Sequence, residues 1–595
     1  MKHTNHLAAC FLIAGAAAGL AWFLDNDYYL RIMFMMCVYY MCSAGMNVLV
    51  GYAGQKSLGQ AGLFATGAYT AALLTTSLDL NPWLALAVSA LTAGLCGILI
   101  ALPSLRVKGP YLAMVTLAFG IVVEKLVSEW TEVFGGPQGL YSIKPLTLSG
   151  IPFSNLQWVL FGIGLCLVTH LLLRNLLRGR FGRALLSLQA DEIASAAVGV
   201  DVYRAKMLAF VIAAVTCGIG GALVAQQNQY FNSDFINLDL SIFILLVVLF
   251  GGSQSLIGPL IGSVLLVLID ALLARWPSLQ HFVYGALLLF ALYIMPTGLA
   301  GVLSGILRKR APVRLSDKVV KTSLVWVPPV MAAHERGSKL LEVDQVSKSY
   351  GGVHPAQNVS FSLQFGHIHA LIGPNGAGKS TMLNMLTGVI DPDKGTIWFC
   401  GAAIGGEQVH AICERGIGRT FQNLRLFGEL SVLDNVMLGR HSRMKNGFWS
   451  SLLSLPVART EEMTACAQAL AILKLVGLSS LSDAPAGCLP YGLQRRVELA
   501  RALATEPRLL LLDEPAAGLN PQETAELGEL LVRIRDVGVT ILMVEHHMDL
   551  VMSISDHVIV LDYGVKIAEG TPTDVQANSR VIEAYLGVDA SAEAA

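Results

Sequence analysis

A series of long apolar runs fills the first half of this 595-residue chain and limits what that half can fold into. The runs lie near residues 7–24, 29–50, 58–78, 83–103, 111–131, 155–173, 206–226, 241–251, 255–274 and 282–304. Most are long enough to cross a hydrocarbon layer about 30 Å thick as a helix, which satisfies its own backbone hydrogen bonds there. The first half is therefore predicted to be an α-helical polytopic membrane domain with about ten spans.

The distribution of charge separates this half from the rest of the chain. Only 26 of the 83 Asp, Glu, Lys and Arg residues precede residue 306, which leaves an ordinary soluble composition for the second half. The net charge of −1 gives no indication of a nucleic-acid partner. The 10 cysteines have neither metal nor disulfide spacing, and we interpret them as reduced, small apolar residues.

Basic residues between the runs predict the orientation in the membrane. With the N-terminus inside, 14 basic residues fall in inside segments and only three, Arg31, Lys144 and Arg275, fall outside. The N-terminus and the second half are therefore both predicted to be cytoplasmic. The run 7–24 could instead be a cleaved signal peptide, but another apolar run follows at once, which favours an uncleaved span.

Glycine-rich breaks interrupt the apolar pattern at residues 51–60, 109–111 and 135–139. Irregular backbone at membrane depth is tolerated where it lines a protein-walled cavity, and broken helices often form substrate sites. Small residues are also common where helices pack, so both interpretations stay open.

The inside loop 174–205 contains a helix-forming stretch, residues 184–198. Its apolar residues Leu185, Leu188, Ile193 and Ala197 have roughly helical spacing, and the stretch is too short and polar to cross the membrane. We predict a coupling helix that docks into a cytoplasmic partner; the alternative is a helix that lies on the membrane surface.

The second half contains a phosphate-binding loop. After a charged, proline-containing linker (306–339), a strand-like run at 367–372 leads into the sequence GPNGAGKST at residues 373–381, and a helical run follows. The glycines let backbone N–H groups face a phosphate at a helix N-terminus. In this motif Lys379 would reach the β- and γ-phosphates, and the Ser380 hydroxyl would ligate Mg²⁺.

Two further strand-like runs deliver polar residues that complete such a site. The run 509–512 ends in Asp513 and Glu514, which suit an Mg²⁺-binding carboxylate and a water-polarising carboxylate. The run 539–544 ends in Glu545, His546 and His547, and one histidine is expected to sense the γ-phosphate.

With these motifs, residues 340–590 resemble the ATP-binding cassette (ABC) family. The resemblance extends to a signature motif at 489–503, a Q-loop at 419–423 and a D-loop at 517–520. It implies ATP and Mg²⁺ as cofactors and an α/β P-loop cassette with a helical subdomain. It assigns catalysis to Glu514, His546 and Gln422, and metal binding to Ser380, Gln422 and Asp513. The implied nucleotide contacts are Tyr350, Gly373, Asn375, Gly376, Gly378, Lys379, Ser380, Thr381, Gln422, Leu489, Pro490, Tyr491 and Gly492.

Within that family the cassette is similar to ATPases of branched-chain amino acid importers, through residues 514–521 and 570–587. The first half is similar to their permeases at residues 45–55, 67–70, 109–120, 135–139 and 180–184. The expected domains are a permease (1–305), a linker (306–339) and a cassette (340–595). The resemblance implies an ATPase that imports a small polar solute: a branched-chain amino acid, a related amino acid or amide, or a small organic acid. A non-transporting ABC machine that gates a channel or signals is the alternative, and an exporter is disfavoured.

The same resemblance predicts partners and a location. A second permease and a second ATP-binding subunit are expected, together with a periplasmic solute-binding protein, membrane lipid and the bacterial inner membrane. Pro490 stands where the signature usually has serine, and it offers neither a hydroxyl nor a backbone N–H. This departure favours a heteromer, in which one ATP site keeps an ordinary signature, over a homodimer.

Overall fold

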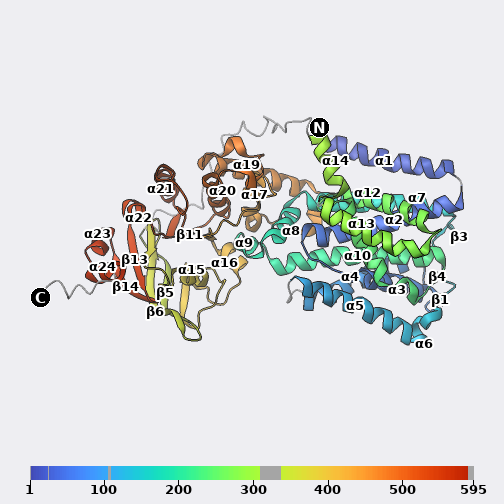
Figure 1. The fold of residues 1–595 in the computed structure, drawn as a ribbon, viewed down its shortest axis with the longest axis horizontal. Helices are drawn as coiled ribbons and strands as arrows, with labels where there is room; N and C mark the ends of the chain where they lie inside the picture. The colour runs from blue at the N-terminus through green and yellow to red at the C-terminus, as the bar shows by residue number, and fades with distance from the viewer. Residues whose placement is uncertain (1, 25, 105–108, 296, 309–336, 587–595) are drawn as a thin grey trace. The chain divides into compact units, whose positions relative to one another are not determined.

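The computed structural model describes residues 2–24, 26–104, 109–295, 297–308 and 337–586. They form two compact units (Figure 1). A helical unit holds the described residues of 1–189, 203–312 and 451–454, and an α/β unit holds those of 190–202, 313–450 and 455–595. Most of the expected linker, residues 309–336, lies outside the described residues.

The helical unit contains a helix at each of the ten apolar runs. Its helices are α1 (Lys2–Leu24), α2 (Asp27–Met46), α3 (Gln60–Thr76), α4 (Pro82–Ser104), α5 (Pro110–Glu129), α6 (Thr131–Phe134), α7 (Asn155–Leu177), α8 (Arg180–Ala190), α10 (Val202–Asn228), α11 (Leu238–Gly251), α12 (Gly258–Leu273), α13 (Pro277–Ile294) and α14 (Gly298–Arg308). Within the described ranges, six helices are long and apolar enough to span a membrane, and shorter apolar helices occur at 8–24, 258–273 and 282–291. The prediction of a helical, multi-pass membrane domain is confirmed, whereas the number of ten spans stays a prediction.

Two predicted runs are interrupted. The run 282–304 is not one helix, because α13 ends at Ile294 and α14 begins at Gly298. After α2 the chain forms a wider π-type turn (Asn47–Tyr52) and then leaves the helical path until Gln60. The Asn47 side chain explains this second break: its Nδ2 donates to Ser255 O (2.9 Å) and its Oδ1 accepts from Gln254 N (3.1 Å) in the turn between α11 and α12.

The predicted coupling helix 184–198 is also divided. Helix α8 ends at Ala190, and α9 (Glu192–Ala197) begins anew because the Asp191 carboxylate caps it, accepting hydrogen bonds from Ile193 N and Ala194 N. A capping aspartate adopts an extended backbone and therefore ends the preceding helix. Residues 190–202 belong to the α/β unit.

Two sheets form the centre of the α/β unit. Their strands are β5 (Lys339–Tyr350), β6 (Val353–Gln364), β7 (Ile368–Ile372), β8 (Lys394–Phe399), β9 (Ala402–Ala403), β10 (Ile417–Arg419), β11 (Leu509–Asp513), β12 (Thr540–Val544), β13 (His557–Asp562) and β14 (Val565–Gly570). A six-stranded sheet has the order β10-β11-β12-β7-β13-β14, parallel except for β14. An antiparallel four-stranded sheet has the order β6-β5-β8-β9. The strand-like runs at 367–372, 509–512 and 539–544 are all strands, namely β7, β11 and β12.

The other helices of this unit surround the two sheets. They are α15 (Lys379–Leu386), α16 (Val409–Arg415), α17 (Val432–Gly439), α19 (Pro456–Leu475), α20 (Tyr491–Ala504), α21 (Pro521–Asp536), α22 (Met548–Ile554), α23 (Pro572–Gln576) and α24 (Ser579–Leu586). The short helix α18 (Phe448–Leu452) is divided between the two units, because residues 451–454 belong to the helical unit.

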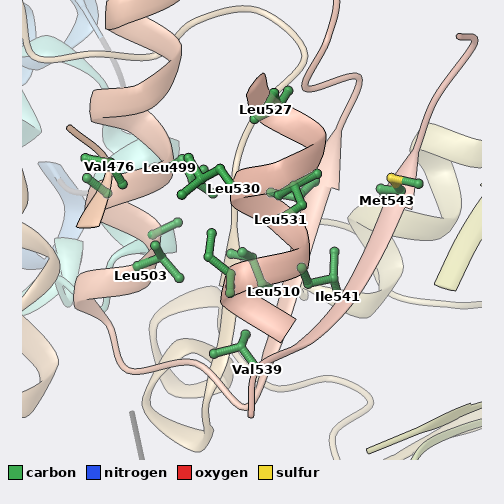
Figure 2. Close-up of a cluster of buried hydrophobic side chains, with 14 of the residues drawn as sticks. Val476, Leu499, Leu503, Leu510, Leu527, Leu530, Leu531, Val539, Ile541 and Met543 are labelled. Atoms are coloured by element: carbon green, nitrogen blue, oxygen red, sulfur yellow. The ribbon is translucent and has the colours of Figure 1, made fainter. Parts of the chain in front are cut away.

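Strand β11 shows how the core divides, because successive side chains of a strand point to opposite faces. Leu510 packs with Leu503 of α20 and Leu530 of α21 in one hydrophobic cluster (Figure 2). Its neighbour Leu511 packs with Phe361 of β6 in another. Both faces of β11 are covered, which explains its continuous apolar sequence, typical of a buried parallel strand. The buried strand holds Asp513 in a fixed position at its end.

Candidate active site

The polar residues predicted for the site meet at one edge of the six-stranded sheet. Strands β10, β11, β12 and β7 are parallel neighbours, so their carboxyl ends lie side by side. Arg419 ends β10, Asp513 ends β11, and Glu545 follows β12. The phosphate loop follows β7. In open parallel sheets this edge is where ligands bind.

The phosphate loop has the backbone that the motif requires. Gly378, the residue before α15, has a φ of 96°, and a Cβ there would clash with the carbonyl oxygen of Pro355. The buried Lys379 donates from Nζ to Gly373 O (2.7 Å) and Pro374 O (2.9 Å). Burial lowers the pKa of Lys379, while the nearby carboxylates of Glu514 and Asp513 act in the opposite direction. A buried ammonium group beside a ring of backbone N–H groups is suited to phosphate.

Asp513 is paired with an arginine that the sequence did not single out. Its Oδ2 lies 3.4 Å from Arg419 Nη2, and both side chains are buried. Arg419 also donates from Nη1 to Thr387 Oγ1 (2.9 Å). Burial raises the pKa of Asp513, and Arg419 offsets this effect. The second oxygen, Oδ1, is buried and has no hydrogen-bond partner in the part of the chain that the structure describes.

The structure brings together Glu514 and His546, two of the residues to which the resemblance assigns catalysis. His546 Nε2 lies 3.1 Å from Glu514 Oε1. Glu514 has a φ of 48°, in the left-handed region that non-glycine residues rarely adopt, and its N–H donates to Val544 O (2.9 Å). Backbone strain of this kind persists where surrounding contacts enforce it, often at functional positions. The partly buried carboxylate is thereby held at the carboxyl end of β11.

Glu545 is a positioning residue that sequence reasoning missed. It is 1% exposed, and its Oε1 accepts from Ala516 N (2.6 Å) while its Oε2 accepts from His546 N (3.0 Å). The side chain thus ties the start of the D-loop segment to the backbone of the histidine. The only sequence signal was an acidic residue directly after a buried strand.

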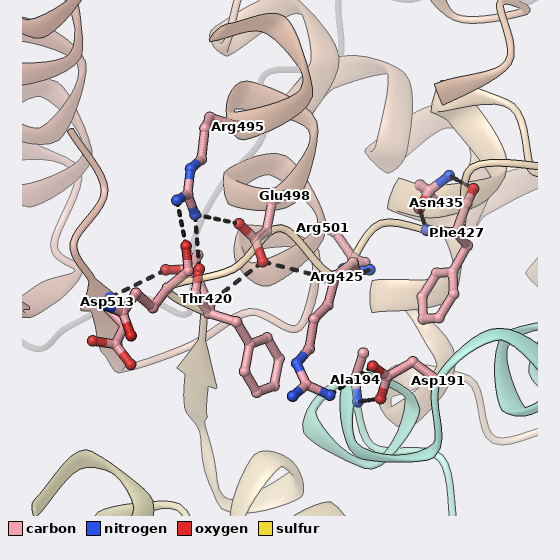
Figure 3. Close-up of polar contacts among 12 residues, drawn as sticks. Asp191, Ala194, Thr420, Arg425, Phe427, Asn435, Arg495, Glu498, Arg501 and Asp513 are labelled. Atoms are coloured by element: carbon pink, nitrogen blue, oxygen red, sulfur yellow. Dashed lines mark hydrogen bonds and ion pairs between the residues drawn. The ribbon is translucent and has the colours of Figure 1, made fainter. Parts of the chain in front are cut away.

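A buried ionic network holds the backbone around the exposed Gln422 (Figure 3). Arg495 Nη1 donates to Phe421 O (2.7 Å), and Glu498 Oε1 accepts from Phe421 N (3.2 Å). Arg501 Nη1 donates to Arg425 O (2.7 Å). All three charged side chains belong to α20, the helix that follows the signature residues. Burial raises the pKa of Glu498, against the effect of Arg501 and Arg495.

The same network reaches α9. Arg425 Nη1 lies 2.6 Å from Asp191 Oδ2, the carboxylate that caps α9 (Figure 3). Asp201 Oδ2 lies 3.7 Å from His410 Nε2 of α16. A Cβ on Gly199 would clash with the side chain of Ser442. Residues 191–201 are thus fitted closely to the segment after Gln422 and to α16.

The signature residues lie at the start of α20. Pro490 is the N-cap and is exposed, and Tyr491 OH lies 3.0 Å from Arg495 Nη2. Gly492 has Glu523 as its neighbour. Among the described residues, no hydrogen bond or ion pair joins residues 489–492, Tyr350 or Ser380 to Asp513, Glu514 or His546. Tyr350 itself is 48% exposed, with Lys348 Nζ 5.5 Å from its ring centroid.

A cavity of about 530 Å³ opens beside the phosphate loop. Its lining includes residues 374–377, Tyr563 after β13, and Arg580 and Glu583 of α24. The C-terminal helix therefore contributes side chains next to the loop.

Comparisons with known proteins cover both units. A family model described as a branched-chain amino acid transport system permease component matches residues 28–292. The ABC transporter model matches residues 356–517, and a model of the branched-chain amino acid ATP-binding cassette transporter matches residues 565–591.

Individual relatives match the α/β unit. The high-affinity branched-chain amino acid transport ATP-binding protein BraF of Pseudomonas aeruginosa is 43% identical over 249 residues, 42% of this chain and 98% of the relative. The high-affinity branched-chain amino acid transport ATP-binding protein LivG of Escherichia coli K12 is also 43% identical over 249 residues, which are 42% of this chain and 98% of LivG. Among solved structures, a nucleotide-free ATP-binding cassette from an ABC transporter is 32% identical, covering 42% of this chain and 100% of that chain, with a TM-score of 0.38.

Proposed function

Since the chain belongs to the branched-chain amino acid transporters of the ABC family and joins their permease and ATP-binding parts, we propose that it uses ATP hydrolysis to import a small polar solute. The protein is a multi-pass membrane protein and an ATPase that binds ATP. The proposed solute is a branched-chain amino acid or a related amino acid, amide or small organic acid.

The pair of Glu514 and His546 at the end of β11 and β12 carries the catalytic part of this proposal. Glu514 is placed to orient and polarise the water that attacks the γ-phosphate, and His546, 3.1 Å away, is placed to contact that phosphate. Lys379 would neutralise charge on the β- and γ-phosphates. Phosphoryl transfer depends mainly on such positioning and charge stabilisation.

Mg²⁺ fits the donor set beside this pair. Ser380, Gln422 and Asp513 would hold it, and the unpartnered, buried Oδ1 of Asp513 is a hard oxygen ligand of the kind that Mg²⁺ prefers. A bound Mg²⁺ would supply charge neutralisation between the β- and γ-phosphates. Tyr350 would stack on the adenine from the end of β5.

Residues 191–201 are proposed as the coupling segment. The ion pair between Asp191 and Arg425 lies three residues after Gln422, so a change at the Q-loop would reach Asp191 directly. The network of Arg495, Glu498 and Arg501 extends this link to the signature helix.

The direction, the location and the partners follow from the resemblance to importers and from the distribution of basic residues. We place the chain in the bacterial inner membrane with the N-terminus and the ATPase cytoplasmic. A second permease, a second ATP-binding subunit and a periplasmic solute-binding protein complete the transporter. A non-transporting ABC machine is less well supported, because the permease model covers most of the helical unit.

Reconstitution of the complete transporter in liposomes with its solute-binding protein tests the proposal. We expect ATP-dependent accumulation of radiolabelled leucine that requires the liganded binding protein and is lost with Glu514→Gln. ATP hydrolysis that never moves any of the proposed solutes would favour the non-transporting machine instead.

A further inference from the structure

The interruption between α2 and α3 places the start of α3 deep inside the helical unit. Cys217 Sγ donates to the backbone oxygen of Gln60, the first residue of α3, at 3.3 Å. Cys217 lies near the middle of α10 (Val202–Asn228), one of the helices that can span a membrane. Helix α3 therefore begins beside the middle of α10.

The Gln60 side chain is buried there with its hydrogen-bonding capacity unused. Gln60 is 0% exposed, and neither its Nε2 nor its Oε1 has a hydrogen-bond partner among the described residues. Two backbone donors beside it are satisfied: Ser241 Oγ accepts from Ala61 N (3.0 Å), and Thr116 Oγ1 accepts from Leu58 N (2.9 Å). The hydroxyl of Tyr69, two turns further along α3, is likewise buried without a partner in the described ranges. Buried polar groups are almost always hydrogen-bonded, so these orphan groups call for a missing partner.

The electrostatic surroundings favour a carboxylate as that partner. The N-terminus of a helix carries a partial positive charge, and Gly59 adds no side-chain cap to α3. In a helix the Cα–Cβ bonds tilt toward the N-terminus, so the Gln60 side chain lies at this open end. Ser241 belongs to the first turn of α11, so a second helix N-terminus meets the same point. Interrupted helices that present N-termini to an anionic solute are a common feature of transporters.

An apolar wall lies one helical turn away. Phe64 follows Gln60 by four residues and therefore lies on the same face of α3. Its ring is 6.2 Å from that of Phe231, which is 5.2 Å from the ring of Tyr69.

Given the proposed function, on which this inference rests, we propose that the start of α3 binds the transported solute as a zwitterionic amino acid. The amide of Gln60 offers a donor for the carboxylate and an acceptor for the ammonium group. The partial charge of the helix supports the carboxylate, and the aromatic rings of Phe64 and Phe231 receive an aliphatic side chain. This chemistry selects an amino acid over urea or a simple organic acid.

Gln60→Leu in the complete reconstituted transporter tests the site. Removing a hydrogen bond to a charged solute group should lower leucine uptake by about 10- to 100-fold. ATP hydrolysis stimulated by the liganded binding protein should stay within about twofold of the wild type. Because the variant removes an unsatisfied buried amide, its melting temperature should equal or exceed that of the wild type; a merely structural glutamine would make it fall.

Two comparisons make the result decisive. Thr66→Val, also on α3 but bonded to its own helix at Gly62 O (2.8 Å), should transport normally. Gln60→His, whose neutral ring keeps one donor and one acceptor, should retain most of the uptake even if Gln60→Leu fails to assemble. Normal uptake by Gln60→Leu, or loss of uptake in a stable Gln60→His, would overturn the site. A wild-type transporter that moves an amide or an organic acid but no amino acid would overturn the site and leave the proposed function standing. A wild-type transporter that moves none of the proposed solutes would overturn the proposed function.

Discussion

Glu514 combines backbone strain with a partly buried side chain. Its positive φ and its contact with His546 fix the carboxylate at the end of β11, where we propose that it polarises the attacking water. Glu514→Gln keeps the shape but removes the charge that polarises the water. We expect ATP binding to persist and hydrolysis to fall by about 10²- to 10⁴-fold, measured as phosphate release beside nucleotide affinity. Lys379→Ala should instead lose nucleotide affinity. Wild-type hydrolysis by Glu514→Gln would remove Glu514 from catalysis.

Glu498 is the residue whose loss should cost most stability. It is 1% exposed and lies between the guanidinium groups of Arg495 (3.2 Å) and Arg501 (3.8 Å). Glu498→Ala leaves two buried cations without their counter-charge, which typically destabilises a protein by about 3–5 kcal/mol. Thermal unfolding of the purified transporter should show a clearly lower transition for the α/β unit. The exposed Glu529→Gln on α21 is the matched control and should change little.

Helix α9 is the element that we propose to couple ATP hydrolysis to transport. Asp191→Asn preserves a capping oxygen but removes the ion pair with Arg425, whereas Asp191→Ala removes both. We therefore expect the number of solute molecules moved per ATP to fall in both variants, more strongly in Asp191→Ala, while nucleotide affinity is unchanged. Unaltered uptake per ATP in Asp191→Ala would show that α9 has no role in coupling.

Strand β7 carries a histidine that makes the α/β unit sensitive to acid. Burial lowers the pKa of His369 to about 4, and its Nε2 accepts from Gln364 N (3.0 Å). The nearby rings of His557 and His367 lower this pKa further. The hydrogen bond with the Gln364 backbone and the charge of Asp556 raise it, but by less than burial lowers it. Because the unfolded chain binds the proton with a pKa near 6.5, the stabilisation is complete above that pH and is lost as pH falls toward 4.

The expected loss is about 2 kcal/mol at pH 5 relative to pH 7. Thermal unfolding of the transporter at both pH values measures it, with His369→Gln as the control that cannot titrate. The melting temperature of the wild type should fall further between pH 7 and pH 5 than that of the variant. Equal losses would show that other groups govern the acid sensitivity.

The elements differ in how far the sequence alone could predict them. The loop 373–381 and the acidic pair at the end of β11 could be predicted, because each depends only on a buried strand and on the residues next to its end. The pairing of Arg419 with Asp513 joins residues 94 positions apart, so no local pattern encodes it. The glycine-rich stretch 51–60 indicated a break after α2, but the contact that holds it, from Asn47 to the turn at Gln254 and Ser255, joins residues more than 200 positions apart. The division at Asp191 is a cap within a helix-forming run.

At the scale of the whole molecule, one chain supplies one permease and one cassette. The signature of a cassette faces the ATP of a second cassette, as the family resemblance implies, so this chain cannot complete an ATP site with its own signature. Two arrangements satisfy that need. Two identical chains can pair, or this chain can pair with a different permease and a different ATP-binding subunit.

Pro490 distinguishes these arrangements. It caps α20 at an exposed position and has neither the hydroxyl nor the N–H that a signature serine offers to a phosphate. In a homodimer both ATP sites would lack that contact. In a heteromer this contact is missing only at the ATP site where Pro490 meets the ATP of the other subunit. At the second ATP site, Lys379 and Glu514 face the ordinary signature of that subunit. We therefore expect native mass spectrometry of the transport-competent complex to show a single 63.6 kDa chain with two other membrane-bound subunits. A dimer of this chain that transports without them would exclude the heteromer, and Pro490→Ser would then be expected to raise its ATPase rate at both sites.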